Sequence, residues 1–162
     1  MSDEVSSPPA GFQVGVGRTV ARLGRQVEIA LAKIDLTTAQ YRTLTQLDDG
    51  EEASSSLAAK LAVSRPSVTA VVEGLVERGL VDRRHSDQDR RRVSVNLTES
   101  GRQVLAQADQ VVSAKLADLL AAVSTRQAAQ AVSGITAWGK AMDANKARKH
   151  AAAGHGQPLA AV

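Results

Sequence analysis

The segment of residues 57–98 constrains the fold of this chain more than any other. Its first part has the apolar spacing of two short helices, separated by a tight turn at Val63. A strand can begin at Leu80, and apolar residues then alternate with polar ones over 93–97, which is the period of a half-buried strand. The order helix, turn, helix and hairpin predicts a winged helix-turn-helix, a fold that places one helix in the DNA major groove and a basic ribbon beside it.

The second helix of this segment has clear signals for its start and its end. Ser64 is a good N-cap, Pro66 falls in the first turn, where a missing N–H costs nothing, and Gly79 can end the helix in a left-handed conformation. Hydroxyl groups, an arginine and free backbone N–H groups at a helix start can bond phosphates or base edges. The same residues can also serve only as a cap and a solvated face. The candidate DNA-binding residues of this helix are Ser64, Arg65, Pro66, Ser67 and Thr69.

The predicted hairpin is crowded with arginine. Asp89 and Arg91 are two residues apart, so in an extended ribbon they share a face, and the carboxylate can hold the guanidinium in one rotamer for insertion into a narrow minor groove. The alternative is a solvated loop with one surface ion pair worth under about 1 kcal/mol. Because so many like charges repel one another, the cluster favours an anionic partner, namely DNA. The candidate wing residues are Arg83, Arg84, Asp89, Arg90, Arg91 and Arg92.

The rest of the chain divides into segments of different character. The predicted parts are a disordered tail at 1–15, an N-terminal dimerisation helix at 16–35, the winged helix-turn-helix domain at 36–98, C-terminal dimerisation helices at 99–145 and a disordered tail at 146–162. The expected class is therefore mostly α with a small β wing. The helices on either side of the winged domain carry more apolar surface than so small a domain can cover, which predicts a homodimer.

Local capping patterns support these helix boundaries. Thr37 with Gln40, and Ser124 with Gln127, have the spacing of a capping box, in which the hydroxyl accepts a backbone N–H and the amide reaches back. Thr98 is placed to cap the helix that follows the hairpin. These patterns predict helices that begin near residues 38, 99 and 125.

Composition excludes several classes of protein. The chain has 43% hydrophobic residues, enough for a core, but only 2% aromatic residues, so the core is mostly Ala, Val and Leu. The absence of cysteine excludes disulfides, thiolate metal sites and thiol-based redox sensing. No run approaches the roughly 18 apolar residues that a membrane span requires, and the N-terminal residues lack the pattern of a signal peptide. A cytoplasmic location is expected.

No constellation typical of an enzyme or a metal site is present in the sequence. His85, His150 and His155 are far apart, without a second ligand at metal spacing, and no glycine-rich phosphate loop follows a strand. The expectation is a chain that is not an enzyme and that needs no cofactor. The net charge of +3 is only mildly basic, so the inference of DNA binding depends on the local clustering of charge.

Three stretches resemble the MarR (multiple antibiotic resistance regulator) family. They are LTTAQYRTLTQL at 36–47, LAAKLAVSRPSVTAVVEGLVERGLVDRR at 57–84 and DQDRRRVSVNLTESG at 87–101. The last is similar to the family's Asp-x-Arg wing, followed by a strand and Leu-Thr-x-x-Gly, although Gln88 stands where a proline is common. The resemblance implies a homodimer, a palindromic operator, a recognition helix that begins at Ser64, and a wing in which Asp89 positions Arg91.

The family resemblance also implies a small-molecule effector. Small lipophilic or phenolic ligands bind such proteins between the dimer helices and the winged domain, and Tyr41 would lie near that cleft, although simple packing explains Tyr41 equally well. The sequence thus predicts a sequence-specific DNA-binding repressor that responds to a lipophilic ligand. The alternative is an architectural or protein-interaction winged-helix protein without effector sensing.

Overall fold

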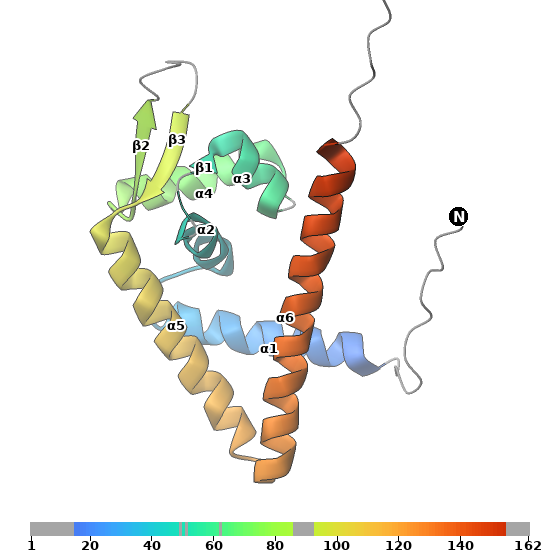
Figure 1. Cartoon of the computed structure of the whole chain (residues 1–162). Coiled ribbons are helices and arrows are strands. Elements are labelled where there is room, and N and C mark those ends of the chain that lie inside the picture. The colour runs from blue at the N-terminus through green and yellow to red at the C-terminus, as the bar shows by residue number, and fades with distance from the viewer. Residues whose placement is uncertain (1–14, 49, 51, 62, 86–92, 155–162) are drawn as a thin grey trace, which may run out of the picture. The chain divides into compact units, whose positions relative to one another are not determined.

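The computed structural model describes residues 15–48, 50, 52–61, 63–85 and 93–154, which contain helices and short strands (Figure 1). The elements are α1 (Gly15–Ala32), α2 (Thr38–Asp48), β1 (Glu52–Ala53), α3 (Ser54–Leu61), α4 (Arg65–Glu77), β2 (Val81–His85), β3 (Val93–Leu97), α5 (Glu99–Leu120) and α6 (Thr125–Gly154). This order confirms the predicted class, mostly α-helical with a small sheet. The chain forms two compact units, Met1–Leu116 and Ala117–Val162. The predicted N-terminal tail, apart from its last residue, lies outside the described residues.

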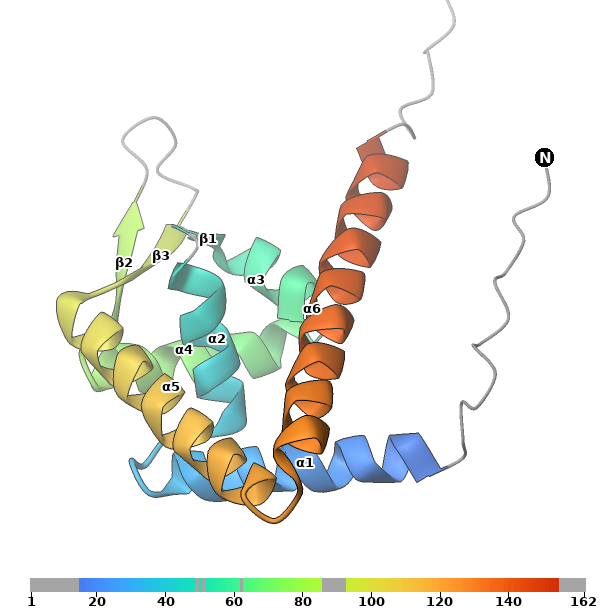
Figure 2. The ribbon, with the colours of Figure 1, turned by 60° about the horizontal axis from the view of Figure 1, so that its bottom comes forward.

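The sheet of the first unit is antiparallel, with the strand order β1-β3-β2. Its register pairs Val81 with Leu97 at one end and His85 with Val93 at the other. Val81 of β2 is buried. Along β3, Val95 and Leu97 are buried, whereas Ser94 and Asn96, which alternate with them, are partly exposed. The predicted alternation is therefore confirmed over residues 94–97, for which burial is described, and α4 lies beside β2 (Figure 2).

One hydrophobic core joins the winged elements to α1 and to the first half of α5. Leu31 of α1 is fully buried in it, so the end of α1 packs onto the winged domain. Complete burial of a leucine contributes about 1.5–3 kcal/mol, which is enough to hold the end of α1 in place. The largest fully buried side chains are Leu31, Leu44, Leu57, Leu75, Val72, Val95 and Thr43.

The predicted capping boxes are formed. The Thr37 N–H donates to Gln40 Oε1 at 3.0 Å, and the Gln40 N–H donates to Thr37 Oγ1 at 3.1 Å. The Ser124 N–H donates to Gln127 Oε1 at 3.1 Å, and the Gln127 N–H donates to Ser124 Oγ at 3.4 Å. Each box satisfies backbone donors that the first turn of a helix leaves without partners.

Helix α4 ends as its sequence predicts. Gly79 is left-handed, with φ of 67°. The Leu80 N–H donates to Leu75 O at 2.9 Å, and the Gly79 N–H donates to Val76 O at 2.8 Å. This pair of bonds is a Schellman motif, which a glycine at the left-handed position permits without steric cost.

The start of α5 is fastened to that same turn. Thr98 caps the helix, because its Oγ1 accepts the Gly101 N–H at 3.0 Å. The same hydroxyl lies 2.8 Å from Gly79 O and 3.1 Å from Leu80 O, to either of which it can donate. Gly101 packs so closely that a Cβ there would overlap Leu80 O. The end of α4, the start of β2 and the start of α5 are thus joined at one place.

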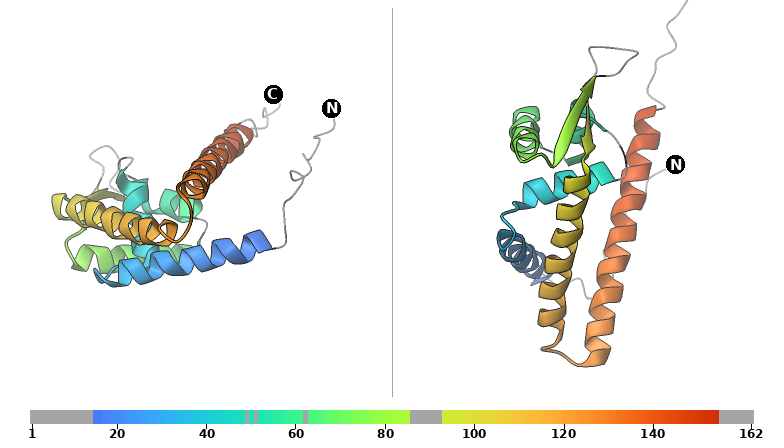
Figure 3. Two further views of the ribbon diagram at one scale, coloured as in Figure 1. Left: turned by 90° about the horizontal axis from the view of Figure 1, so that it is seen from below. Right: turned by 90° about the vertical axis from the view of Figure 1, so that its left-hand side faces the viewer.

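The predicted start of the C-terminal tail is wrong. The sequence places an unstructured tail at 146–162, but α6 continues as one helix to Gly154 (Figure 3). The reason is that alanine, lysine and arginine, which are strong helix formers, dominate this stretch. In addition, no proline occurs between the start of α6 and Pro158. None of the helices in the described ranges is both long and apolar enough to cross a membrane.

The second unit exposes a row of large apolar side chains along α6. Their spacing of three and four residues places them on one face of the helix. They are between 51% and 64% exposed, far more than a residue in a monomer core. The row consists of Val132, Ile135, Trp138 and Met142, and it is called the α6 apolar face below.

Candidate nucleic-acid interface

The predicted recognition residues lie together at the start of α4. Val68, Val72 and Leu75 are buried and hold one face of the helix against the core. The opposite side of the first turns is exposed, so the sequence-predicted residues reach solvent together. These exposed residues are Ser64, Arg65, Pro66, Ser67 and Thr69.

Hydrogen bonds within α4 order the hydroxyl groups of this site. The Ser67 N–H donates to Ser64 Oγ at 3.3 Å, which confirms Ser64 as the N-cap. The two serine hydroxyls lie 2.7 Å apart and share a hydrogen bond. Thr69 Oγ1 donates to Arg65 O at 3.0 Å. Each hydroxyl oxygen keeps acceptor capacity, and the positive end of the helix dipole lies at the same place, so the site is suited to an anion or a base edge.

The second half of α4 has the opposite charge. Glu73 and Glu77 are exposed one and two turns beyond Thr69. Carboxylates repel DNA phosphates. Contacts between α4 and the DNA backbone are therefore expected only in the first half of the helix.

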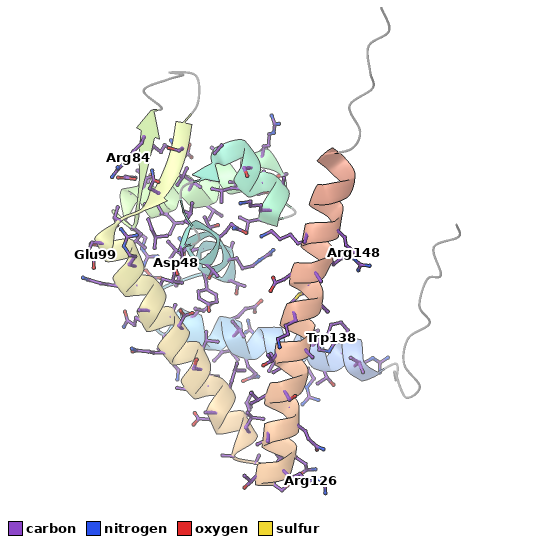
Figure 4. All side chains as sticks on the ribbon, viewed as in Figure 1. Asp48, Arg84, Glu99, Arg126, Trp138 and Arg148 are labelled. Carbon is purple, nitrogen blue, oxygen red and sulfur yellow. The ribbon has the colours of Figure 1, made fainter. Side chains whose placement is uncertain are left out.

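Arg83 and Arg84 at the base of the hairpin have acidic partners. Arg84 Nε and Nη2 both donate to Asp82 Oδ2 at 3.2 Å, and the Arg84 side chain, 69% exposed, points away from β3 (Figure 4). Arg83 Nη2 lies 4.0 Å from Glu73 Oε1. The sequence did not lead us to predict either ion pair, although the two-residue spacing of Asp82 and Arg84 on one strand face could have revealed the first.

These exposed ion pairs leave both arginines able to bind a phosphate. A surface pair contributes about 0–1 kcal/mol, so a phosphate can replace the carboxylate at little cost. The other predicted wing residues lie outside the described residues; they are Asp89, Arg90, Arg91 and Arg92. Within the described ranges, no group of three or more histidine, aspartate or glutamate side chains could hold a metal ion.

A small apolar pocket lies between α2, α3 and the first half of α4. One of its polar members, Arg42, donates from Nη2 to Leu61 O at 3.0 Å, which ties α2 to the end of α3. The pocket is lined by Ala39, Arg42, Thr43, Leu61, Val63, Ser67, Val68 and Val71. Tyr41, the residue singled out for a ligand cleft, does not line it.

Tyr41 instead connects α2 with α5. It packs partly buried against the core, and its hydroxyl donates to Asp109 Oδ1 at 2.6 Å. Burial, reinforced by the hydrogen bond and the negative charge of Asp109, raises the pKa of Tyr41 to about 12. The phenol therefore remains a neutral donor across the physiological pH range, and any ligand at this place must replace its bond to Asp109.

Comparison with known proteins gives one consistent match. The sequence model described as MarR family matches residues 34–92, which begin in the turn between α1 and α2 and continue beyond β2. The chain is also similar to CouR, described as a transcriptional repressor bound to a 23-mer DNA duplex. The identity is 30%, the match covers 76% of this chain and 87% of that one, and the TM-score is 0.64.

Two other solved structures have the same fold. RV1404 from Mycobacterium tuberculosis is 27% identical, with 78% of this chain and 88% of that one covered and a TM-score of 0.69. Wild-type MarR from E. coli in its apo form is 23% identical, with 76% and 96% covered and a TM-score of 0.68. The elements that carry the candidate interface are thus shared with these proteins.

Proposed function

Because this chain belongs to the MarR family of winged-helix DNA-binding transcription regulators, we propose that it is a repressor that binds a palindromic operator as a homodimer and is released by a small lipophilic ligand. The observation that carries this proposal is the exposed start of α4, which combines a capped helix terminus, an arginine and hydroxyls, on a helix that is followed by a hairpin with exposed Arg83 and Arg84. The similarity to a repressor in complex with DNA supports it. The proposal requires no catalytic group and no cofactor.

In this proposal α4 reads the major groove and the hairpin reads the minor groove. The capped start of α4 binds phosphates and base edges through Ser64, Arg65, Pro66, Ser67 and Thr69. Arg83 and Arg84 exchange their acidic partners for the DNA backbone. Asp89 orients Arg91 toward the groove, and the arginines on either side of it hold phosphates.

The homodimer places two such readers on one duplex. The α6 apolar face, together with Leu119 and Val123, exposes more apolar side chains than a monomer ordinarily leaves in water. A second copy of the chain is the occupant we propose for this surface. A two-fold dimer matches a palindrome, because it presents two α4 helices about one DNA turn apart.

Release by a ligand is proposed to act at Tyr41. A ligand that takes the hydroxyl of Tyr41 away from Asp109 loosens the link between α2 and α5. A useful response requires the ligand to favour the form that cannot bind DNA by a few kcal/mol. The carboxylate of Asp109 repels an acid, so a neutral phenol is expected to act more strongly than a salicylate-like acid at this place.

A genome-wide binding map, followed by a footprint on the most strongly bound DNA at one fixed salt concentration, tests the proposal. The expected result is a saturable, symmetric footprint on a palindrome that neutral phenols weaken. An architectural protein would instead protect all sequences with little discrimination. A symmetric footprint that no phenol or lipophilic acid alters would remove the ligand-sensing part and leave the DNA-binding part in place.

Arg91→Ala is expected to weaken operator binding by about 1–3 kcal/mol with little change in the midpoint of unfolding, because a wing contact does not contribute to the core. Asp89→Ala is expected to cause nearly the same loss. Both are measured by titration of a labelled operator duplex, with Arg102→Ala as the matched control, since the Arg102 side chain pairs with Glu99 on its own helix, 3.4 Å from Nε to Oε2. Tighter binding by Asp89→Ala would show that Asp89 is a repelling surface acid and does not position Arg91.

A further inference from the structure

We propose that Arg78 is a positioning residue for DNA reading, which sets the direction of α4 by tying its end to the turn between α1 and α2. The proposal rests on the function proposed above. Arg78 is the C-cap residue of α4 and does not belong to the candidate interface, which lies at the other end of the helix.

The acceptor for Arg78 is a rigid backbone group. Arg78 Nη1 donates to Asp35 O at 2.7 Å, across 43 residues of sequence. Asp35 is left-handed, with φ of 53°, and the surrounding N–H groups close the end of α1, since Leu36 N donates to Leu31 O at 3.1 Å. The carbonyl that accepts from Arg78 thus belongs to a hydrogen-bonded turn that is itself anchored to the buried end of α1.

Gln40 adds a second point of attachment. Its Oε1 accepts the Thr37 N–H at 3.0 Å in the capping box of α2 and lies 3.5 Å from Arg78 Nη1. Its amide also reaches the side of α4, because a Cβ at Gly74 would stand 3.9 Å from Gln40 Nε2. Arg78 therefore connects the end of α1, the start of α2 and the end of α4.

The other side of the α4 end is held by α5. The Thr98 hydroxyl contacts the carbonyls of Gly79 and Leu80, directly after Arg78. The end of α4 is thus attached to two other segments of the chain, and Val68 and Val72 hold the first half of the same helix against the core. Together these contacts set the direction in which the exposed side of the DNA-reading end points.

The distance between the two ends of α4 shows why the direction of the helix matters. From residue 78 to residue 65 a helix extends about 20 Å, so a difference of about 5° in its direction displaces the reading end relative to residue 78 by about 1.7 Å. Specific contacts tolerate displacements of only about 0.5 Å. Loss of one hydrogen bond at Arg78 can therefore disturb base reading while the core residues of α4 keep the helix folded.

The test compares the full-length chain with Arg78→Ala and Arg78→Lys on an operator duplex and on a shuffled duplex of equal length. Arg78→Ala is expected to lower operator affinity about five- to tenfold, the loss of one charge-assisted hydrogen bond at an exposed site, and to leave the shuffled duplex unchanged. Arg78→Lys is expected to recover most of the affinity, because an ammonium group can still donate to Asp35 O. The salt dependence of operator binding is expected to keep its slope, and Arg102→Ala is the matched control.

Each other outcome overturns a defined part of the proposal. Equal weakening on both duplexes, with a salt slope smaller by about one, would make Arg78 a phosphate contact. A lower midpoint of thermal unfolding with unchanged operator affinity would make it a stabilising residue only. If the unaltered chain binds both duplexes equally, the proposed function fails and the positioning role fails with it.

Discussion

Gly101→Ala is expected to destabilise the first unit by about 3 kcal/mol. Alanine normally stabilises a helix relative to glycine by about 0.5–1 kcal/mol, so the sign of this effect is informative. Here the added Cβ would overlap Leu80 O, a backbone atom that Thr98 also holds, and neither group can rotate away as a side chain can. The measurement is the midpoint of urea unfolding at one protein concentration, with the slope unchanged.

Gly74→Ala is the matched control for this prediction. Gly74 is also a helical glycine of the same unit, but its added Cβ would meet only Gln40 Nε2, at an ordinary contact distance of 3.9 Å. It is expected to raise stability by about 0.5–1 kcal/mol. If Gly101→Ala is as stable as Gly74→Ala, the close packing of α5 on Leu80 is wrong.

Ile135→Glu is expected to convert the proposed dimer to a monomer and to lower operator affinity at least about a hundredfold. A charge at the centre of the α6 apolar face would be buried without a partner at a dimer interface, which costs several kcal/mol. A monomer binds one half-site and loses the second, linked binding event, whose effect on affinity is about 10²–10⁴-fold. Sedimentation at micromolar concentration and titration of the operator duplex measure the two effects.

Ala137→Glu is the control, because it adds the same charge on the opposite, exposed side of α6. It is expected to leave both measurements unchanged. Trp138, the single tryptophan of the chain, reports on the same face, so its fluorescence is expected to shift with dilution of the unaltered protein. A monomer in the unaltered protein, or a dimer unaffected by Ile135→Glu, would contradict the proposed interface.

Local chemistry in the sequence determined most of the secondary structure. Ser64 starts α4 and Gly79 ends it because a side-chain acceptor and a left-handed residue meet needs that arise within one turn of helix. The alternation of apolar and polar residues over 93–97 likewise depends only on neighbours in the sequence, and it determined which face of the strand turns toward the core. The helix after Ser124 was also predicted, but its end was not, because weak propensities summed over many residues decided it.

The contacts that orient the candidate interface were decided only by the tertiary structure. Arg78 and Asp35 are separated by 43 residues, and Tyr41 and Asp109 by 68, so no spacing rule connects them. The same holds for Gly101. Only the folded structure brings Leu80 O against this position, and only then is there no room for a side chain. Residue types along the chain indicate what an element can bind, but the direction in which a folded helix points depends on hydrogen bonds between elements that meet only after folding.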